Sequence, residues 1–210
     1  MDIDELERRA GKIADEWQGI FATYEAFYIQ SIMYTADRCL ESFERYDKLR
    51  RDGGAGVDQV SAVHEALGHA ASLSRYFWQS GAGPRKRPKM SALQKARAQK
   101  LRDAFGLSDS SALRDRSLRD SLEHFDERLD EYLLRSGAGQ YLPLPRVGDS
   151  DGLPDGIKHI FKLVDPERQV FVILDRRFEF GPILAEVEQI LLAARRLSEN
   201  GDRLPHREPQ

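Results

Sequence analysis

Three glycine-rich stretches interrupt a chain whose first two-thirds otherwise show helical periodicity. They are R-D-G-G-A-G-V-D at 51–58, S-G-A-G-P at 80–84 and S-G-A-G at 136–139. Clustered glycines adopt the positive backbone angles that end helices, so each stretch predicts a helix terminus. The segments between them are therefore expected to be separate helices that pack into a bundle.

Apolar residues recur at helical spacing within these segments. The longest segment predicts a core helix on which Tyr24, Phe27 and Ile32 share the apolar pattern, and Ser91 is the expected N-cap of a shorter, basic helix. The predicted helices span 3–17, 21–49, 57–79, 91–106 and 110–135.

The sequence changes character after Tyr141. Two runs of β-branched and aromatic residues, H-I-F-K-L-V and V-F-V-I-L, are joined by D-P-E-R at 165–168 and predict a β-hairpin, and a last helix is expected from Gly181. The predicted fold is thus mainly α. A bundle of four to five helices would occupy 1–140, the hairpin and last helix would pack on it at 141–200, and a disordered tail would follow at 201–210.

Composition limits the classes of protein to which the chain can belong. Its 210 residues suffice for one sizeable core, and 40% hydrophobic with 32% charged residues is typical of a globular protein in water. No apolar run approaches the roughly 18 to 20 residues that span a bilayer, and the acidic N-terminus lacks a secretory signal, so a cytoplasmic location without membrane contact is expected. Its single Cys39 excludes an internal disulfide, and a net charge of -3 gives no overall attraction to nucleic acid.

Two motif-like stretches do not fit the chemistry that they suggest. H-E-A-L-G-H at 64–69 places its histidines five residues apart, about 140° around a helix, whereas the zinc-protease pair is four apart on one face. S-G-A-G-P-R-K lacks the spacing of a phosphate loop and follows a predicted helix instead of a strand. The sequence therefore predicts no metal site and no cofactor.

The segment 84–102 contains eight lysines and arginines and no acidic residue. Clustered cations create a local positive field that attracts nucleic-acid phosphates, even in a chain with net negative charge. A solvated, charged linker explains the same composition equally well. The candidate RNA-binding residues of this segment are Arg85, Lys86, Arg87, Lys89 and Lys95.

The hexapeptide R-D-S-L-E-H at 119–124 lies within the predicted helix 110–135. At about 100° per residue, an apolar stripe that includes Leu118 and Leu122 defines the core side, and Arg119, Asp120 and His124 are predicted on the polar side. Arg116 precedes Asp120 by four residues and is a further candidate for RNA binding. From spacing alone, an ordinary solvated helix face accounts for the pattern.

The same residues also suit metal-free RNA cleavage. An imidazole such as that of His124 can move a proton on or off the 2′-hydroxyl or the leaving oxygen, and a guanidinium such as that of Arg119 can neutralise charge on the phosphate. Asp120 can hydrogen-bond the imidazole and hold its orientation. Because Arg119 and His124 lie at the two edges of a wide polar arc, two copies packed across a two-fold axis would be needed to form one groove.

The pattern L-R-D-S-L-E-H-F-D-E-R-L-D-E resembles the R-x4-6-H motif of the HEPN superfamily, and the likeness covers about residues 15–136. The resemblance implies an up-and-down helical bundle that dimerises through its motif helices. Many members are metal-independent endoribonucleases that act as toxins or defence effectors, often beside an antitoxin, and others bind RNA or proteins without catalysis. Arg119 and His124 match the catalytic pair, and Asp120 stands where Asn is commoner.

These observations predict a cytoplasmic, homodimeric, HEPN-like endoribonuclease whose substrate is RNA and whose activity needs no metal. His124 is its expected acid and base, Arg119 its phosphate-binding cation and Asp120 the residue that orients the histidine. The resemblance also suggests an antitoxin or other protein partner. The alternative is a non-catalytic module that binds RNA or protein, which the acidic residues around the motif favour.

Overall fold

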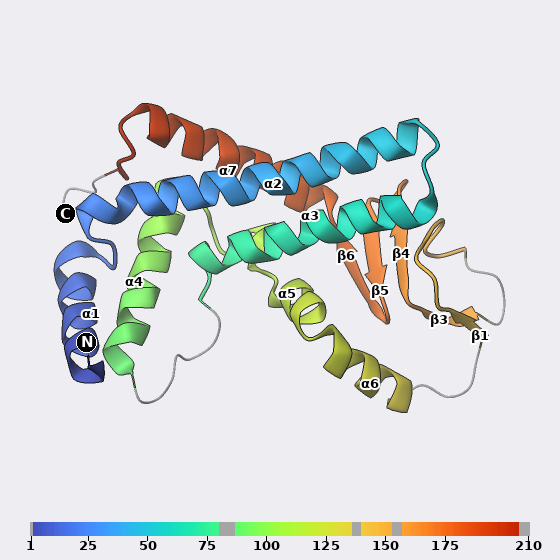
Figure 1. Cartoon of the computed structure of the whole chain (residues 1–210), viewed down its shortest axis with the longest axis horizontal. Coiled ribbons are helices and arrows are strands. Elements are labelled where there is room, and N and C mark those ends of the chain that lie inside the picture. The colour runs from blue at the N-terminus through green and yellow to red at the C-terminus, as the bar shows by residue number, and fades with distance from the viewer. Residues whose placement is uncertain (1, 80–86, 136–139, 153–156, 206–210) are drawn as a thin grey trace. The chain divides into compact units, whose positions relative to one another are not determined.

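The computed structural model describes residues 2–79, 87–135, 140–152 and 157–205. Within them the chain forms seven α-helices and two small sheets, which confirms the predicted mainly α fold (Figure 1). Two compact units can be distinguished and are described separately. The first combines Met1–Ala36, Ser72–Arg114 and Gln189–Gln210, and the second combines Asp37–Ala71 and Asp115–Glu188.

The helices follow the predicted order along the chain. Glycines end them where expected: α2 stops just before Gly53, and Gly106 closes α4 with a φ of 68°. The stretches 80–84 and 136–139, predicted to end two other helices, lie outside the described ranges. The helices are α1 (Ile3–Trp17), α2 (Glu25–Arg51), α3 (Gly56–Phe77), α4 (Pro88–Phe105), α5 (Arg116–Glu123), α6 (Phe125–Arg135) and α7 (Gly181–Glu199), with 3-10 turns at Ala22–Tyr24 and Ala112–Arg114.

The strands all belong to the second unit. The predicted hairpin is confirmed as β4 and β5, which pair antiparallel, and β6 and β2 extend it on either side in the order β2-β4-β5-β6. Strand β2 runs parallel to β4, and a separate parallel pair joins β1 to β3. The bounds are β1 (Gln140–Leu142), β2 (Arg146–Val147), β3 (Ile157–Ile160), β4 (Lys162–Asp165), β5 (Val170–Ile173) and β6 (Arg176–Glu179).

In the first unit, α1 packs along α4 (Figure 1). The Glu7 carboxylate accepts hydrogen bonds from the backbone N–H groups of Lys89 and Met90, at 2.9 and 3.1 Å, and so caps α4 from a neighbouring helix. The prediction that Ser91 is the N-cap is wrong, because the helix already begins at Pro88, whose ring is well suited to the first turn.

The aromatic residues near the start of α2 are more exposed than their spacing predicted. Tyr24 is 53% and Phe27 71% exposed, whereas Ile29 and Ile32 are fully buried. At about 100° per residue, Phe27 lies about 160° around the helix from Ile29, so the aliphatic residues define the buried side. The assignment of Tyr24 and Phe27 to the core was therefore wrong, and that of Ile32 is confirmed.

The core of the second unit forms around β4 and β5. Leu163 and Phe171 are fully buried, and the ring of His64 from α3 stacks on Phe171 with 5.9 Å between ring centroids. Phe43 from α2 stacks on Phe180 at 5.8 Å. Burial on both faces explains the continuous apolar runs that predicted these strands.

In the first unit, the residues after α7 are also packed. Leu204 is 2% exposed, and its backbone N–H donates to the Glu25 carboxylate at 3.0 Å. Residues 206–210 of the predicted disordered tail lie outside the described residues. The predicted division of the chain near residue 140 stays a prediction.

Candidate functional site

The segment predicted as one helix at 110–135 is broken into a 3-10 turn, α5 and α6. Asp115 caps α5 by accepting a hydrogen bond from the Ser117 N–H at 2.7 Å. At the other end, His124 has φ -114° and ψ 40°, outside the helical range, and α6 starts with the next residue. The prediction of a continuous helix was wrong in this respect.

A side chain accounts for the break at His124. The carbonyl of Asp120 accepts one hydrogen bond from the His124 N–H at 3.3 Å and a second from the Arg128 Nε at 3.1 Å. An inserted side-chain donor of this kind is a known cause of helix kinks. Arg128 thus joins the last turn of α5 to the first turn of α6.

The structure does not bring Arg119 and His124 together on one solvated face. Arg119 is 3% exposed, whereas the His124 side chain is 58% exposed. The buried residues Leu118, Arg119 and Ser121 span an arc of about 160° on α5, wider than the apolar pattern suggested. The prediction that Arg119 points away from the core was therefore wrong.

Asp120 contacts Arg119 rather than His124. Its Oδ1 lies 3.9 Å from the Arg119 Nε, and the pair helps to offset the cost of burying the guanidinium. The imidazole instead lies near Glu127, whose Oε2 is 3.8 Å from His124 Nδ1. Glu127 is therefore better placed than Asp120 to orient the imidazole.

Three of the five predicted RNA-binding residues of the basic segment lie within the described residues. Arg85 and Lys86 lie outside the described residues. Lys89 and Lys95 are exposed on α4. Arg87 directly precedes that helix and is partly buried. These three residues remain candidates for contacts with phosphate.

Other cations of α4 have structural roles within the first unit. Lys100 is 12% exposed and pairs with the buried Glu25 at 2.8 Å. Arg102 donates to the carbonyl of Phe77, and the Arg97 guanidinium lies over the Tyr28 ring at 5.7 Å. The positive charge that α4 offers to a ligand is consequently smaller than its sequence suggests.

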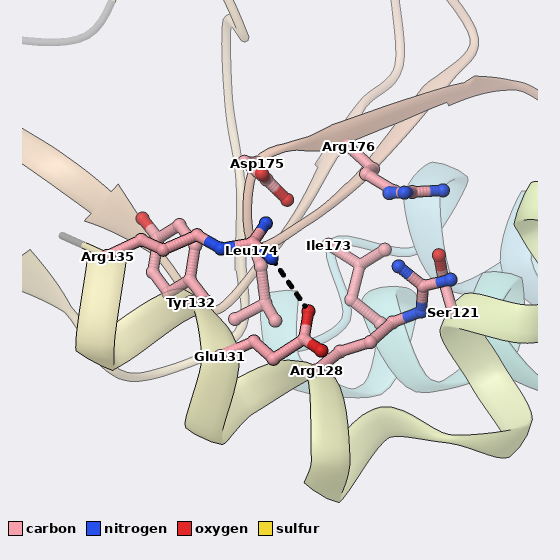
Figure 2. Close-up of a pocket in the computed structure, with 9 residues that line it drawn as sticks. All are labelled: Ser121, Arg128, Glu131, Tyr132, Arg135, Ile173, Leu174, Asp175 and Arg176. Carbon is pink, nitrogen blue, oxygen red and sulfur yellow. Dashed lines mark hydrogen bonds and ion pairs between the residues drawn. The ribbon is translucent and has the colours of Figure 1, made fainter.

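A pocket of about 440 Å³ lies in the second unit between α5–α6 and the turn that joins β5 to β6. Figure 2 shows the side chains of Arg128 and Arg176 directed toward the end of the pocket where Ser121 lies. At the other end, Arg135 pairs with Glu131 at 3.3 Å, as the dashed line in Figure 2 marks. The sequence analysis did not identify this pocket, because its arginines come from segments nearly 50 residues apart in the chain.

A second polar feature of this unit is half-buried beside Phe125, the first residue of α6. Lys162 Nζ lies 3.4 Å from His64 Nδ1 and sits over the rings of Phe125 and Phe161, at 5.0 and 4.9 Å. Burial, together with the positive charge of Lys162, lowers the pKa of His64 from 6.5 to about 4. Burial also lowers the pKa of Lys162. A neutral His64 can accept a hydrogen bond from the lysine.

This pair predicts a loss of stability in mild acid. His64 becomes protonated below pH 6.5 in the unfolded chain but only near pH 4 in the folded chain. The contribution of neutral His64 to the free energy of unfolding is therefore complete above pH 6.5 and is lost as the pH falls toward 4. We expect about 2 to 3 kcal/mol less free energy of unfolding from this source at pH 4.5 than at pH 7.5. Urea unfolding of wild type and His64→Leu at both pH values measures it, and parallel losses in the two proteins would contradict it.

Within the described ranges, no group of three or more His, Cys, Asp or Glu residues could hold a metal ion. No helix in the same ranges is long and apolar enough to cross a membrane. Comparisons of the chain with protein-family models, with curated proteins and with solved structures gave no match.

Proposed function

We propose that this chain is a HEPN-like, metal-independent endoribonuclease in which His124 transfers protons. The observation that supports this most is the 58% exposure of the His124 side chain at the break between α5 and α6. An accessible imidazole can act as base or acid without a metal. The hexapeptide 119–124 supplies the family resemblance on which the substrate class rests.

The reaction we propose is attack of an RNA 2′-oxygen on the adjacent phosphorus. The bond from phosphorus to the 5′-oxygen breaks, which leaves a 2′,3′-cyclic phosphate and a 5′-hydroxyl. One proton leaves the 2′-hydroxyl and another must reach the departing 5′-oxygen. Since each chain offers one His124, two copies related by a two-fold axis would supply a base and an acid, which supports a homodimeric site.

The phosphate-binding role passes to a different arginine under this proposal. Arg119 is buried and supports α5 from within, so it does not contact RNA in this arrangement. Arg116 is exposed on the first turn of α5 and lies four residues before Asp120, on the side of the helix that continues toward His124. Its guanidinium can bind a phosphate oxygen in bidentate fashion.

The test is cleavage of end-labelled single-stranded RNA in EDTA. Wild type should cleave it, and His124→Ala should lower the rate at least ~100-fold, the usual contribution of a positioned acid or base. His69→Gln, which removes a histidine from α3, should leave the rate unchanged. The active species should have twice the 24.0 kDa mass of the chain. Equal cleavage by wild type and His124→Ala, or none by either, would contradict the proposal.

Burial of Arg119 favours a second candidate, a binding module without catalysis. An arginine that is 3% exposed cannot stabilise charge on a bound phosphate, and exposed carboxylates such as Glu123 and Glu127 surround the histidine. Such a module would bind RNA or a protein, including an antitoxin-like partner, and leave RNA intact. Retarded but uncleaved RNA in the same reactions would support it.

A further inference from the structure

Two guanidinium groups of the pocket between α6 and the β5–β6 turn have no carboxylate partner in the described parts of the chain. Among the residues that the structure describes, neither Arg128 nor Arg176 makes an ion pair, and the Arg128 guanidinium donates only to the carbonyl of Asp120. Arg135 differs, because Glu131 already neutralises it. Two like charges at one end of a pocket repel each other unless an anion lies between them.

A buried hydroxyl at the same end also lacks a partner within the described ranges. Ser121 is 1% exposed, and its Oγ has no hydrogen bond to any described residue. Buried hydroxyls are nearly always hydrogen-bonded, because an unpaired one loses its water contacts without compensation. An anionic oxygen between the two arginines would accept a hydrogen bond from this serine.

The rest of the pocket is more polar than apolar, and it suits a flat ring that carries polar groups at its edges. Tyr132 and Leu174 contribute ring and aliphatic surface, and the carboxylates of Glu131 and Asp175 can accept hydrogen bonds from amino or hydroxyl groups (Figure 2). A volume of about 440 Å³ falls in the range of small-molecule sites, roughly 300 to 1,000 Å³. A phosphate alone would fill only part of it.

We infer that this pocket binds a nucleoside monophosphate group, with its phosphate between Arg128 and Arg176 and hydrogen-bonded to Ser121. The base lies along Tyr132, and ribose or base donors contact Glu131 or Asp175. The group can be a free mononucleotide or the terminal nucleotide of an RNA strand, since both offer the same chemistry. His124 does not line this pocket, so binding here does not require cleavage.

Calorimetric titration of the full chain with adenosine 5′-monophosphate tests the site, with adenosine as the ligand that lacks phosphate. Adenosine should bind at least about tenfold more weakly, and Arg176→Gln should weaken the monophosphate by a similar factor, as for loss of one charge-assisted hydrogen bond. Arg146→Gln, which removes an exposed strand arginine outside the pocket, is the matched control and should bind as wild type does. Equal affinity of wild type and Arg176→Gln, or no binding by wild type, would overturn the inference.

Two further experiments test the contact with Ser121 and identify the source of the nucleotide. Ser121→Ala should weaken the monophosphate and leave the far-ultraviolet spectrum unchanged, and His124→Ala should bind it normally even if cleavage is lost. Competition with short RNAs bearing a 5′-phosphate or a 5′-hydroxyl separates the sources: displacement by the phosphorylated strand alone identifies an RNA end, and displacement by neither identifies a free nucleotide. Equal displacement by both strands would overturn recognition of a terminal phosphate at this pocket.

Discussion

Glu25→Ala is expected to lower the free energy of unfolding by about 3 to 5 kcal/mol, as for removal of one partner from a buried ion pair. The Glu25 side chain is completely buried at the start of α2. Its carboxylate accepts hydrogen bonds from Lys100 Nζ at 2.8 Å and from the Leu204 N–H at 3.0 Å. The substitution would leave a lysine that is only 12% exposed without its counter-charge.

Urea unfolding measures this loss, with Glu44→Ala as the control for a glutamate removed from the exposed side of the same helix. The double variant Glu25→Leu, Lys100→Met removes both charges and should recover much of the stability, because no uncompensated charge stays buried. If Glu25→Ala unfolds at the same urea concentration as Glu44→Ala, the buried pair does not stabilise this unit.

Gly19→Ala is expected to be at least as damaging, with a loss of more than about 4 kcal/mol. Gly19 follows α1 with a φ of 85°, and a Cβ at this position would lie 2.2 Å from the backbone nitrogen of Arg97. Backbone atoms of α4 cannot give way as the end of a flexible side chain can. The variant must separate α1 from α4 or distort both.

Gly53→Ala is the matched control for Gly19→Ala. Its φ of 69° carries the same left-handed strain, but no atom lies within 4 Å of the added Cβ. Gly53→Ala should therefore lower the free energy of unfolding only by the roughly 1 to 2 kcal/mol that a left-handed backbone conformation costs alanine. Gly19→Ala is expected to release α1 from α4, and faster proteolysis of α1 at low urea would detect this. Equal stability of Gly19→Ala and Gly53→Ala would contradict the close approach of α1 and α4.

Local signals in the sequence predicted most of the helices and the β4–β5 hairpin. Glycine at positive φ ends α4 at Gly106, and buried β-branched runs flank the D-P-E-R turn, so both features depend on neighbouring residues alone. The strand β6 was missed because R-R-F-E has no strong strand preference, and because the turn before it, at Leu174–Asp175, contains no glycine or asparagine. Pairing with β5 compensates for the weak preference.

The site was harder to predict because its geometry depends on tertiary contacts. Periodicity placed Arg119 on the wet side of a regular helix, but the helix ends at His124 and buries a wider arc than its apolar residues mark. Nothing near Arg128 in the sequence indicated that it would bond to the Asp120 carbonyl and share a pocket with Arg176. Only the exposure of His124 agrees with the role that its motif predicted.

The most direct measurement of the proposed chemistry is the structure of the RNA ends after incubation with the protein in EDTA. Transfer of a proton from the 2′-hydroxyl to His124 requires fragments that carry 2′,3′-cyclic phosphate and 5′-hydroxyl ends, and DNA of the same sequence should stay intact. Wild type should give these ends, and His124→Ala should give neither fragments nor ends above background. Fragments with 3′-hydroxyl ends, or cyclic phosphate formed equally by His124→Ala, would contradict the assignment of His124 as the proton-transfer group.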